Sequence, residues 1–210
     1  MSVDYRAAWL PFDPDHGQTV AVLRLAVSWV GRESKDQERA ALLVTPRKDI
    51  DQYEAPLREF AARHEWGTRR GGMRRRPAGG RPVLVRWPMF DDLVYASSLA
   101  RGASLCATEW PGVPLAGWAS AVGAMNLVTG ETTPRPGDDV VELLEHLRFA
   151  GNNGWFDEPG KRDALRLLGE LRAAAPELDA RFIAGYMLGM GKGASAVENL
   201  VKLAGKKVTP

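Results

Sequence analysis

The sequence predicts an α/β fold: a mostly parallel sheet with flanking helices, followed by an all-helical C-terminal region. Between residues 40 and 130, short apolar runs alternate three times with segments whose apolar residues recur at helical spacing. Such alternation is typical of parallel sheets. The apolar runs are continuous, as expected for strands that are covered on both faces. From residue 138 onward the strand-like runs disappear and only helical spacing continues.

The predicted elements of the α/β part follow in the order strand 40–46, helix 49–66, strand 82–88, helix 90–102, strand 104–111, helix 114–124 and strand 125–131. Asp91 or Asp92 is expected to cap the second of these helices, and Gly102 to end it. The first 39 residues allow two interpretations. DYRAAWLPF and TVAVLRLAVSWVG are two strands joined by residues 13–18, or the second of them is a helix.

The C-terminal part predicts four helices separated by Gly, Pro and Asn. They cover residues 138–151, 158–176, 177–191 and 195–207, with N-cap candidates at Asp138, Asp157, Glu177 or Asp179, and Ser195. The best boundary candidate is TTPRPG at residues 132–137. We therefore expect an α/β domain at 1–133 and a helical region at 138–210.

Composition indicates an ordinary folded protein, and the net charge implies no particular partner. The 210 residues are 45% hydrophobic and 26% charged, with a formal net charge of +2. No run approaches the roughly 20 apolar residues of a membrane-spanning helix, and the N-terminal residues lack the pattern of a secretory signal. We therefore expect a cytoplasmic protein that does not bind a membrane. The one cysteine, Cys106, excludes an intramolecular disulfide and a cysteine-rich zinc site, and we expect it to be a small buried hydrophobe.

No complete catalytic motif is present. The sequence lacks a G-x-G-x-x-G after a strand, a G-x-S-x-G turn, an H-E-x-x-H helix and a calcium-binding loop. The order of strands and helices is Rossmann-like or similar to that of P-loop nucleotide hydrolases, but without a phosphate loop, and fold similarity by itself implies no function. Whether the protein is an enzyme stays open, and the sequence predicts no catalytic residue, cofactor or metal.

The glycine-rich segment GMGKGAS at 189–195 differs from a phosphate loop. Gly193 follows Lys192 where Ser or Thr is required, and a helix rather than a strand precedes the segment. We expect a turn between two helices. A weaker interpretation is that Lys192 and the following helix bind a phosphate of a nucleic acid.

Positive charge is concentrated in one segment. Residues 66–90 contain seven arginines and no acid. Six of them precede the strand at 82–88 and lie in a glycine-rich stretch that favours exposed guanidinium groups: Arg69, Arg70, Arg74, Arg75, Arg76 and Arg81. Such a segment can bind a phosphate backbone. A solvated insertion and a contact with an acidic protein partner are the two alternatives.

A second candidate site lies at the ends of the predicted strands, because open α/β sheets bind ligands outside the carboxyl ends of their strands. These ends lie at residues 45–48, 86–92, 109–112 and 129–131. The residues expected there are Arg86 as an anion clamp, Asp91 and Glu109 as acids, and Trp87 and Trp110 as a surface on which a ring can stack. The alternative is structural: Asp91 caps a helix, Glu109 pairs with Arg86 or Arg101, and the tryptophans belong to the core.

Three functions remain as hypotheses. The leading one is a nucleic-acid-binding or regulatory protein that contacts phosphates through the arginine-rich segment, with DNA and RNA not distinguished. The first alternative is an enzyme or small-ligand sensor that uses the strand-end residues around Glu109. The second is a non-catalytic subunit of an assembly, docking through apolar residues of the third C-terminal helix, for which the internal core is the alternative place: Leu178, Phe182, Ile183, Met187 and Met190.

Overall fold

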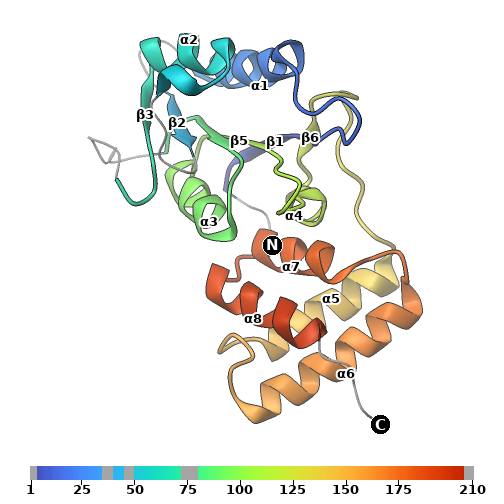
Figure 1. The fold of residues 1–210 in the computed structure, drawn as a ribbon. Helices are drawn as coiled ribbons and strands as arrows, with labels where there is room; N and C mark the ends of the chain where they lie inside the picture. Colours follow the sequence, from blue (N-terminus) through green and yellow to red (C-terminus); the bar gives the residue numbers. More distant parts are fainter. Residues whose placement is uncertain (1–3, 35–39, 45–49, 72–79, 206–210) are drawn as a thin grey trace. The chain divides into compact units, whose positions relative to one another are not determined.

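The computed structural model of the chain describes residues 4–34, 40–44, 50–71 and 80–205 (Figure 1). Its internal contacts group the chain into two units. The α/β unit comprises residues 2–113 and 124–132, and the helical unit comprises residues 114–123 and 133–210. The extent of the domains that fold independently stays a prediction.

The α/β unit contains a six-stranded sheet in which every pair of neighbouring strands is parallel, as the sequence predicts. The strands are β1 (Arg6–Leu10), β2 (Ala41–Val44), β3 (Glu65–Gly67), β4 (Val83–Arg86), β5 (Ser104–Thr108) and β6 (Met125–Asn126). Their order in the sheet is β3-β2-β4-β5-β1-β6. The register aligns Val44 with Arg86, and Arg86 with Thr108, so that these strands end at one level.

Helices cover both faces of this sheet (Figure 1). On one face lie α1 (Val20–Glu33) and α2 (Ala55–Arg63), the latter preceded by a short 3-10 helix (Ile50–Gln52), and on the other lies α3 (Phe90–Leu99). The connections from β1 to β2 and from β2 to β3 run toward the β3 edge of the sheet. The connection from β4 to β5 runs in the opposite direction, toward the β6 edge. Because crossovers are right-handed, their helices fall on opposite faces. Strands β2 and β4 are therefore neighbours whose connections lead away from each other, to α2 on one face and to α3 on the other, and open α/β sheets bind ligands outside the carboxyl ends of such strands.

The core between the sheet and the α1–α2 face is continuous. It contains Ala8, Leu42, Val44, Leu84 and Cys106 from the strands, together with Ala26, Trp29, Val30, Leu57 and Phe60 from the two helices. The burial of α1 decides between the two interpretations of residues 19–31. This segment is a helix because Leu23, Ala26 and Val30 bury one helical face, and Thr19 caps it by accepting a hydrogen bond from the Val22 amide.

Local differences from the predicted elements occur at helix ends and at the sheet edge. Helix α2 ends at Arg63, and Glu65 and Trp66, expected as its continuation, belong to β3 at the edge of the sheet. Such a three-residue strand has too few positions to show a pattern. The N-cap of α3 is Met89, and Asp92 accepts a hydrogen bond from the Met89 amide from within the first turn.

The helical unit contains α4 (Ala116–Val122), α5 (Asp138–Ala150), α6 (Glu158–Ala174), α7 (Ala180–Gly189) and α8 (Ala194–Ala204). Asp157 and Asp179 cap α6 and α7 as predicted, whereas Gly137 and Gly193 take the cap positions of α5 and α8. Helix α4 approaches α7 so closely that a Cβ added to Gly117 would lie 1.9 Å from the Phe182 carbonyl oxygen. Across both units, none of the described helices is long and apolar enough to cross a membrane.

Candidate functional site

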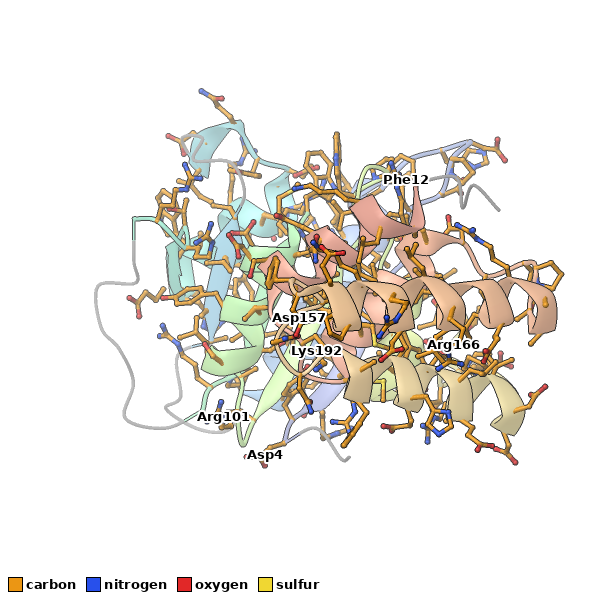
Figure 2. All side chains as sticks on the ribbon, turned by 90° about the horizontal axis from the view of Figure 1, so that it is seen from below. Asp4, Phe12, Arg101, Asp157, Arg166 and Lys192 are labelled. Carbon is orange, nitrogen blue, oxygen red and sulfur yellow. The ribbon has the colours of Figure 1, made fainter. Side chains whose placement is uncertain are left out.

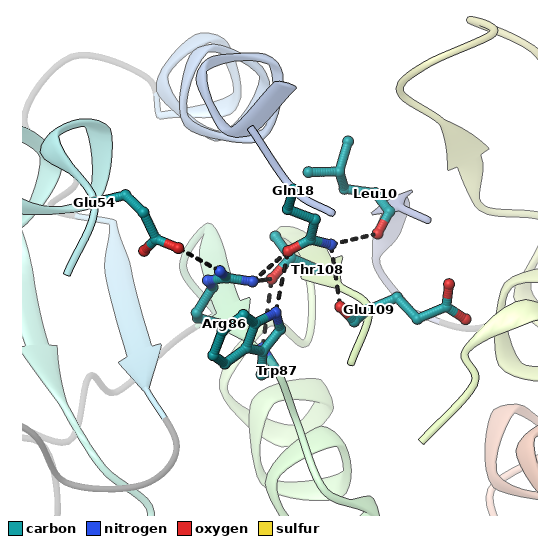
Figure 3. Close-up of polar contacts among 7 residues, drawn as sticks. All are labelled: Leu10, Gln18, Glu54, Arg86, Trp87, Thr108 and Glu109. Carbon is teal, nitrogen blue, oxygen red and sulfur yellow. Dashed lines mark hydrogen bonds and ion pairs between the residues drawn. The ribbon is translucent and has the colours of Figure 1, made fainter. Parts of the chain in front are cut away.

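Polar and aromatic side chains meet at the carboxyl ends of β1, β4 and β5. We call them the strand-end cluster, defined as Gln18, Glu54, Arg86, Trp87, Thr108, Glu109 and Trp110. Figure 3 shows all of them except Trp110, together with Leu10. The cluster lies at the carboxyl edge of the sheet, beside the end of β4, and this is the edge at which open α/β sheets bind ligands.

Arg86 is the buried cation of the cluster. It ends β4 and is 1% exposed. Its Nη2 donates to Glu54 Oε1 at 2.6 Å, and its Nη1 donates to Gln18 Oε1 and to Thr108 Oγ1 (Figure 3). Burial lowers the pKa of Arg86, and the charge of Glu54 opposes that shift. The charge of Arg86, expected to clamp an anion, is thus balanced by a carboxylate of its own unit.

Trp87 has an unusual backbone conformation. Its φ is 51°, in the left-handed region that a bulky residue rarely adopts. Its amide donates to the Thr108 carbonyl oxygen at 3.1 Å, and its indole Nε1 donates to Gln18 Oε1 at 3.1 Å. Its ring lies against the Arg86 guanidinium, whose Cζ is 3.6 Å from the ring centroid. These contacts offset a backbone strain of about 1–3 kcal/mol.

Gln18 connects three strand ends from the loop before α1. Its Nε2 donates to the carbonyl oxygens of Leu10 at 3.2 Å and Glu109 at 3.1 Å, and its Oε1 accepts from Arg86 and Trp87. A side-chain amide has two donor hydrogens and two acceptor lone pairs, and all four are used here. Gln18 therefore fixes the position of the Trp87 ring relative to β1 and β5.

Glu109 joins the ends of β1 and β5. Its amide donates to the Leu10 carbonyl oxygen at 2.9 Å, and its Oε2 accepts from the Phe12 amide at 2.7 Å. The carboxylate expected to act as an acid is thus used to hold the loop that follows β1.

Trp110 is the exposed member of the cluster, at 40% exposure. Its ring centroid lies 4.7 Å from that of Trp87, with the two ring planes tilted by 52°. The indole also packs over Gly112, because a Cβ added there would lie 2.8 Å from Trp110 Nε1. The Trp87–Trp110 pair, which the sequence predicts as a stacking surface, is brought together, and whether it binds a ligand stays a prediction.

Two described arginines of the arginine-rich segment are held by acids of the α/β unit. Arg69 pairs with Asp91 at 2.9 Å and with Asp92 at 3.3 Å, close to the start of α3. Arg81 is 7% exposed and pairs with Glu65 at 2.7 Å. Their guanidinium groups already have carboxylate partners, so a phosphate would have to compete with these acids.

The other members of the segment differ. Arg70 is exposed and has no ion-pair partner among the residues that the structure describes. Arg74, Arg75 and Arg76 lie outside the described residues, as does the predicted strand end at 45–48. Arg70 is thus the described arginine of this segment that is best placed to meet an anion.

Lys192 belongs to the helical unit, in the turn between α7 and α8 (Figure 2). The segment 189–195 forms the predicted helix-to-helix turn. Lys192 Nζ donates to the Gly151 carbonyl oxygen at 2.7 Å, and burial lowers the pKa of the amine. The side chain therefore ties this turn to the end of α5.

The sequence did not identify Gln18 or Glu54 as site residues. Gln18 is 68 positions from Arg86 and Glu54 is 32 positions away, and neither lies in a recognisable motif.

In the described ranges, no group of three or more His, Cys, Asp and Glu side chains is placed to hold a metal ion.

Comparison of the chain with models of protein families, with curated proteins and with solved structures finds no match. The functional assignment therefore depends on the chemistry of the strand-end cluster and of the arginine-rich segment.

Proposed function

We propose that the α/β unit is a non-catalytic binding module that holds a planar ring against the Trp87–Trp110 pair. The observation that carries this proposal is the left-handed backbone of Trp87, with a φ of 51°, which places its ring beside a tryptophan that is 40% exposed. Strained residues persist where surrounding contacts over-determine them, and they cluster at functional sites. The surroundings of Trp87 fit this description, since a buried cation, a side-chain amide and a second indole all hold it.

Binding, rather than catalysis, is the function that this geometry supports. Gln18, Glu54, Arg86 and Thr108 hold one another in hydrogen bonds, and the Glu109 carboxylate holds the Phe12 amide. These groups form a rigid base for the aromatic pair. A ring stacked on an indole gains about 1–3 kcal/mol, so we expect affinities that respond strongly to loss of Trp110.

The test uses protein labelled with 5-fluorotryptophan, in which each of the seven tryptophans gives its own 19F signal. Two uncharged planar probes, adenosine and riboflavin, are compared with one anionic probe, indole-3-acetate. We expect at least one probe to shift the Trp110 and Trp87 signals saturably. Trp110→Ala should weaken that binding by about 5- to 150-fold, which corresponds to the stacking energy.

Trp66→Ala is the matched control, because Trp66 is also exposed, at 37%, but lies on the edge strand β3. It should leave the affinity unchanged. If no planar probe moves the Trp110 signal, or if Trp66→Ala weakens binding as much as Trp110→Ala, the proposal is wrong.

A second proposal keeps the arginine-rich segment as a contact for nucleic acid. It is supported by the exposed Arg70 and by the absence of acids among residues 66–90. A single strand would present phosphates to these arginines and bases to an aromatic surface, the combination used by single-strand-binding proteins. An acidic protein partner stays an alternative for the same segment.

Fluorescence anisotropy of labelled oligonucleotides across a salt series tests this second proposal. Replacing Arg74, Arg75 and Arg76 by Ala should weaken binding of all sequences alike. For single-stranded oligonucleotides, the plot of the logarithm of the binding constant against the logarithm of the salt concentration should become less steep. Its slope should fall in magnitude by about 0.7 for each phosphate that the variant no longer neutralises. No binding at low salt would exclude a nucleic-acid contact while leaving the planar-ring proposal intact.

A further inference from the structure

A cavity of about 350 Å³ that opens to solvent lies in the helical unit. It is lined by α6, the turn before α7, the first turns of α7 and the last residue of α8, through Leu168, Arg172, Pro176, Leu178, Asp179, Ala180, Ile183 and Ala204. Its volume lies at the lower end of the roughly 300–1,000 Å³ of small-molecule sites. It is thus large enough for a ligand of the size of an amino acid.

One part of the lining is apolar. Leu168 and Ile183 are buried and Leu178 is half-buried. Covering apolar surface contributes about 25 cal/mol for each Å² removed from water, so this part favours an occupant with an aliphatic or aromatic group.

Two opposite charges, both on exposed residues, complete the lining at its solvent side. Arg172 Nη2 donates to the Ala204 carbonyl oxygen at 2.5 Å, and Asp179 Oδ1 accepts from the Phe182 amide at 2.7 Å. They do not pair with each other within 4.0 Å, and neither has an ion-pair partner in the described parts of the chain. The guanidinium retains further N–H groups and the carboxylate a second oxygen for a ligand.

The ends of two helices modify these charges without reversing them. Ala180 is the first residue of α7 and Ala204 is the last residue of α8. A helix end carries about half a unit charge, positive at the N-terminus and negative at the C-terminus. Asp179 and Arg172 each carry a full unit of the opposite sign, so the lining stays negative beside α7 and positive beside α8.

We propose that this cavity binds a free α-amino acid with an apolar side chain. The ligand carboxylate binds Arg172, its ammonium group binds Asp179, and its side chain covers Leu168, Leu178 and Ile183. A zwitterion fits because it carries one charge of each sign beside an apolar group, as the lining does. This site belongs to the helical unit, and its test is independent of the strand-end cluster.

Isoleucine methyl NMR gives a direct test, because the chain contains two isoleucines. Ile183 lines the cavity, and Ile50 lies in the α/β unit and serves as the internal control. L-leucine and L-phenylalanine should shift the Ile183 methyl signal saturably and leave the Ile50 signal in place. Glycine, 4-methylpentanoate and 3-methylbutylamine each lack one of the three groups, and each should bind at least about 10-fold more weakly, as expected for loss of a charge-assisted hydrogen bond or of apolar contact.

Two variants separate recognition of the charges from the structure of the site. Asp179→Asn keeps the helix cap, because Asn and Asp are equally good N-caps, and it should weaken L-leucine binding by about 10-fold or more. Arg172→Gln should do the same. Glu177→Gln and Arg181→Gln change neighbouring charges outside the cavity lining and should leave the affinity unchanged.

Three results would overturn the proposal. The first is an Ile183 signal that neither L-leucine nor L-phenylalanine moves at about 10 mM, a concentration that saturates even sites with a Kd of about 1 mM. The second is equal binding of the three comparison compounds. The third is unchanged L-leucine binding in both Asp179→Asn and Arg172→Gln.

Discussion

Arg86 and Trp87 are consecutive in the sequence, yet the Arg86 guanidinium carbon lies 3.6 Å from the centroid of the Trp87 ring. In an extended strand, neighbouring side chains point to opposite faces and cannot stack. The contact forms because the chain leaves the strand conformation at Trp87, where φ is 51°. Backbone strain and cation–π stacking are therefore two aspects of one arrangement, which also directs the Trp87 ring toward Trp110.

Replacing Trp87 by Gly and by Ala separates the backbone strain from the loss of the ring. Both variants remove the same interactions of the indole, but Gly adopts a positive φ without strain, whereas the strain of Ala there costs about 1–2 kcal/mol. The greater freedom of Gly in the unfolded chain reduces this difference. Urea unfolding should therefore show Trp87→Gly to be more stable than Trp87→Ala by about 0.5–1 kcal/mol. The reverse order would mean that Trp87 is not left-handed in solution.

Removing the partner of the buried Arg86 charge should be costly. Glu54→Gln leaves the guanidinium buried without a carboxylate, and its Nε already lacks a hydrogen-bond partner in the described structure. Breaking a fully buried pair costs about 3–5 kcal/mol. Since Glu54 is 30% exposed, we expect a loss of about 2–4 kcal/mol of unfolding free energy, measured by urea denaturation.

A double variant tests whether the uncompensated charge causes this loss. Arg86→Met combined with Glu54→Gln removes the charge and should be more stable than Glu54→Gln alone, because apolar replacements of buried pairs are often neutral or stabilising. The control is Glu59→Gln, whose pairing with Arg24 is exposed on both sides and should change stability by less than about 1 kcal/mol. If Glu54→Gln and Glu59→Gln lost the same unfolding free energy, the Glu54–Arg86 pair would have no special role.

The α/β fold could be predicted because β2, β4 and β5 each contain a continuous apolar run and are fully buried in the sheet. The sequence left α1 undecided because its segment is rich in valine, which favours strands, while Leu23, Ala26 and Val30 also fit a helical face. Strand β3 was missed because it has three residues, of which Trp66 is exposed. Short edge elements depend on their neighbours more than on their own pattern.

The strand-end residues could be predicted in part. Arg86 ends a strand, Trp87 and Trp110 follow strand ends, and parallel strands bring such ends to one edge of a sheet. Their partners could not be predicted, since a carboxylate at residue 54 or an amide at residue 18 becomes a neighbour of Arg86 only when the chain folds. The ion pairs of Arg69 could not be predicted for the same reason, because its partners Asp91 and Asp92 belong to the start of α3.

The buried Cys106 thiol predicts a loss of stability at alkaline pH. Desolvation raises the pKa of Cys106 far above its ordinary value, so the folded protein keeps the thiol proton while the unfolded chain releases it above about pH 8.5. The folded state then binds one more proton, and stability falls by about 1.4 kcal/mol for each further pH unit. Below pH 8.5 the contribution is fully present.

Unfolding of the unmodified protein and of Cys106→Ala between pH 7.5 and 10.5 measures this effect. Burial also raises the pKa of Tyr53, but Tyr53 is present in both proteins and cancels from the difference. The stability of the unmodified protein relative to Cys106→Ala should be constant below about pH 8.5 and should decline above it. A difference that stays constant to pH 10.5 would show that the thiol ionises equally in both states.

Substitution by alanine at two helical glycines, Gly117 and Gly169, should change the stability of the protein in opposite directions. A Cβ at Gly117 in α4 would lie 1.9 Å from the Phe182 carbonyl oxygen in α7, so that α4 and α7 must separate. Gly117→Ala should therefore destabilise the protein by about 3 kcal/mol or more, although Ala is the better helix former. Gly169 in α6 has nothing within 4 Å of an added Cβ, and Gly169→Ala should stabilise the protein by about 1 kcal/mol. Thermal unfolding of the two variants distinguishes the effects, and a neutral Gly117→Ala would mean that α4 and α7 are not in close backbone contact.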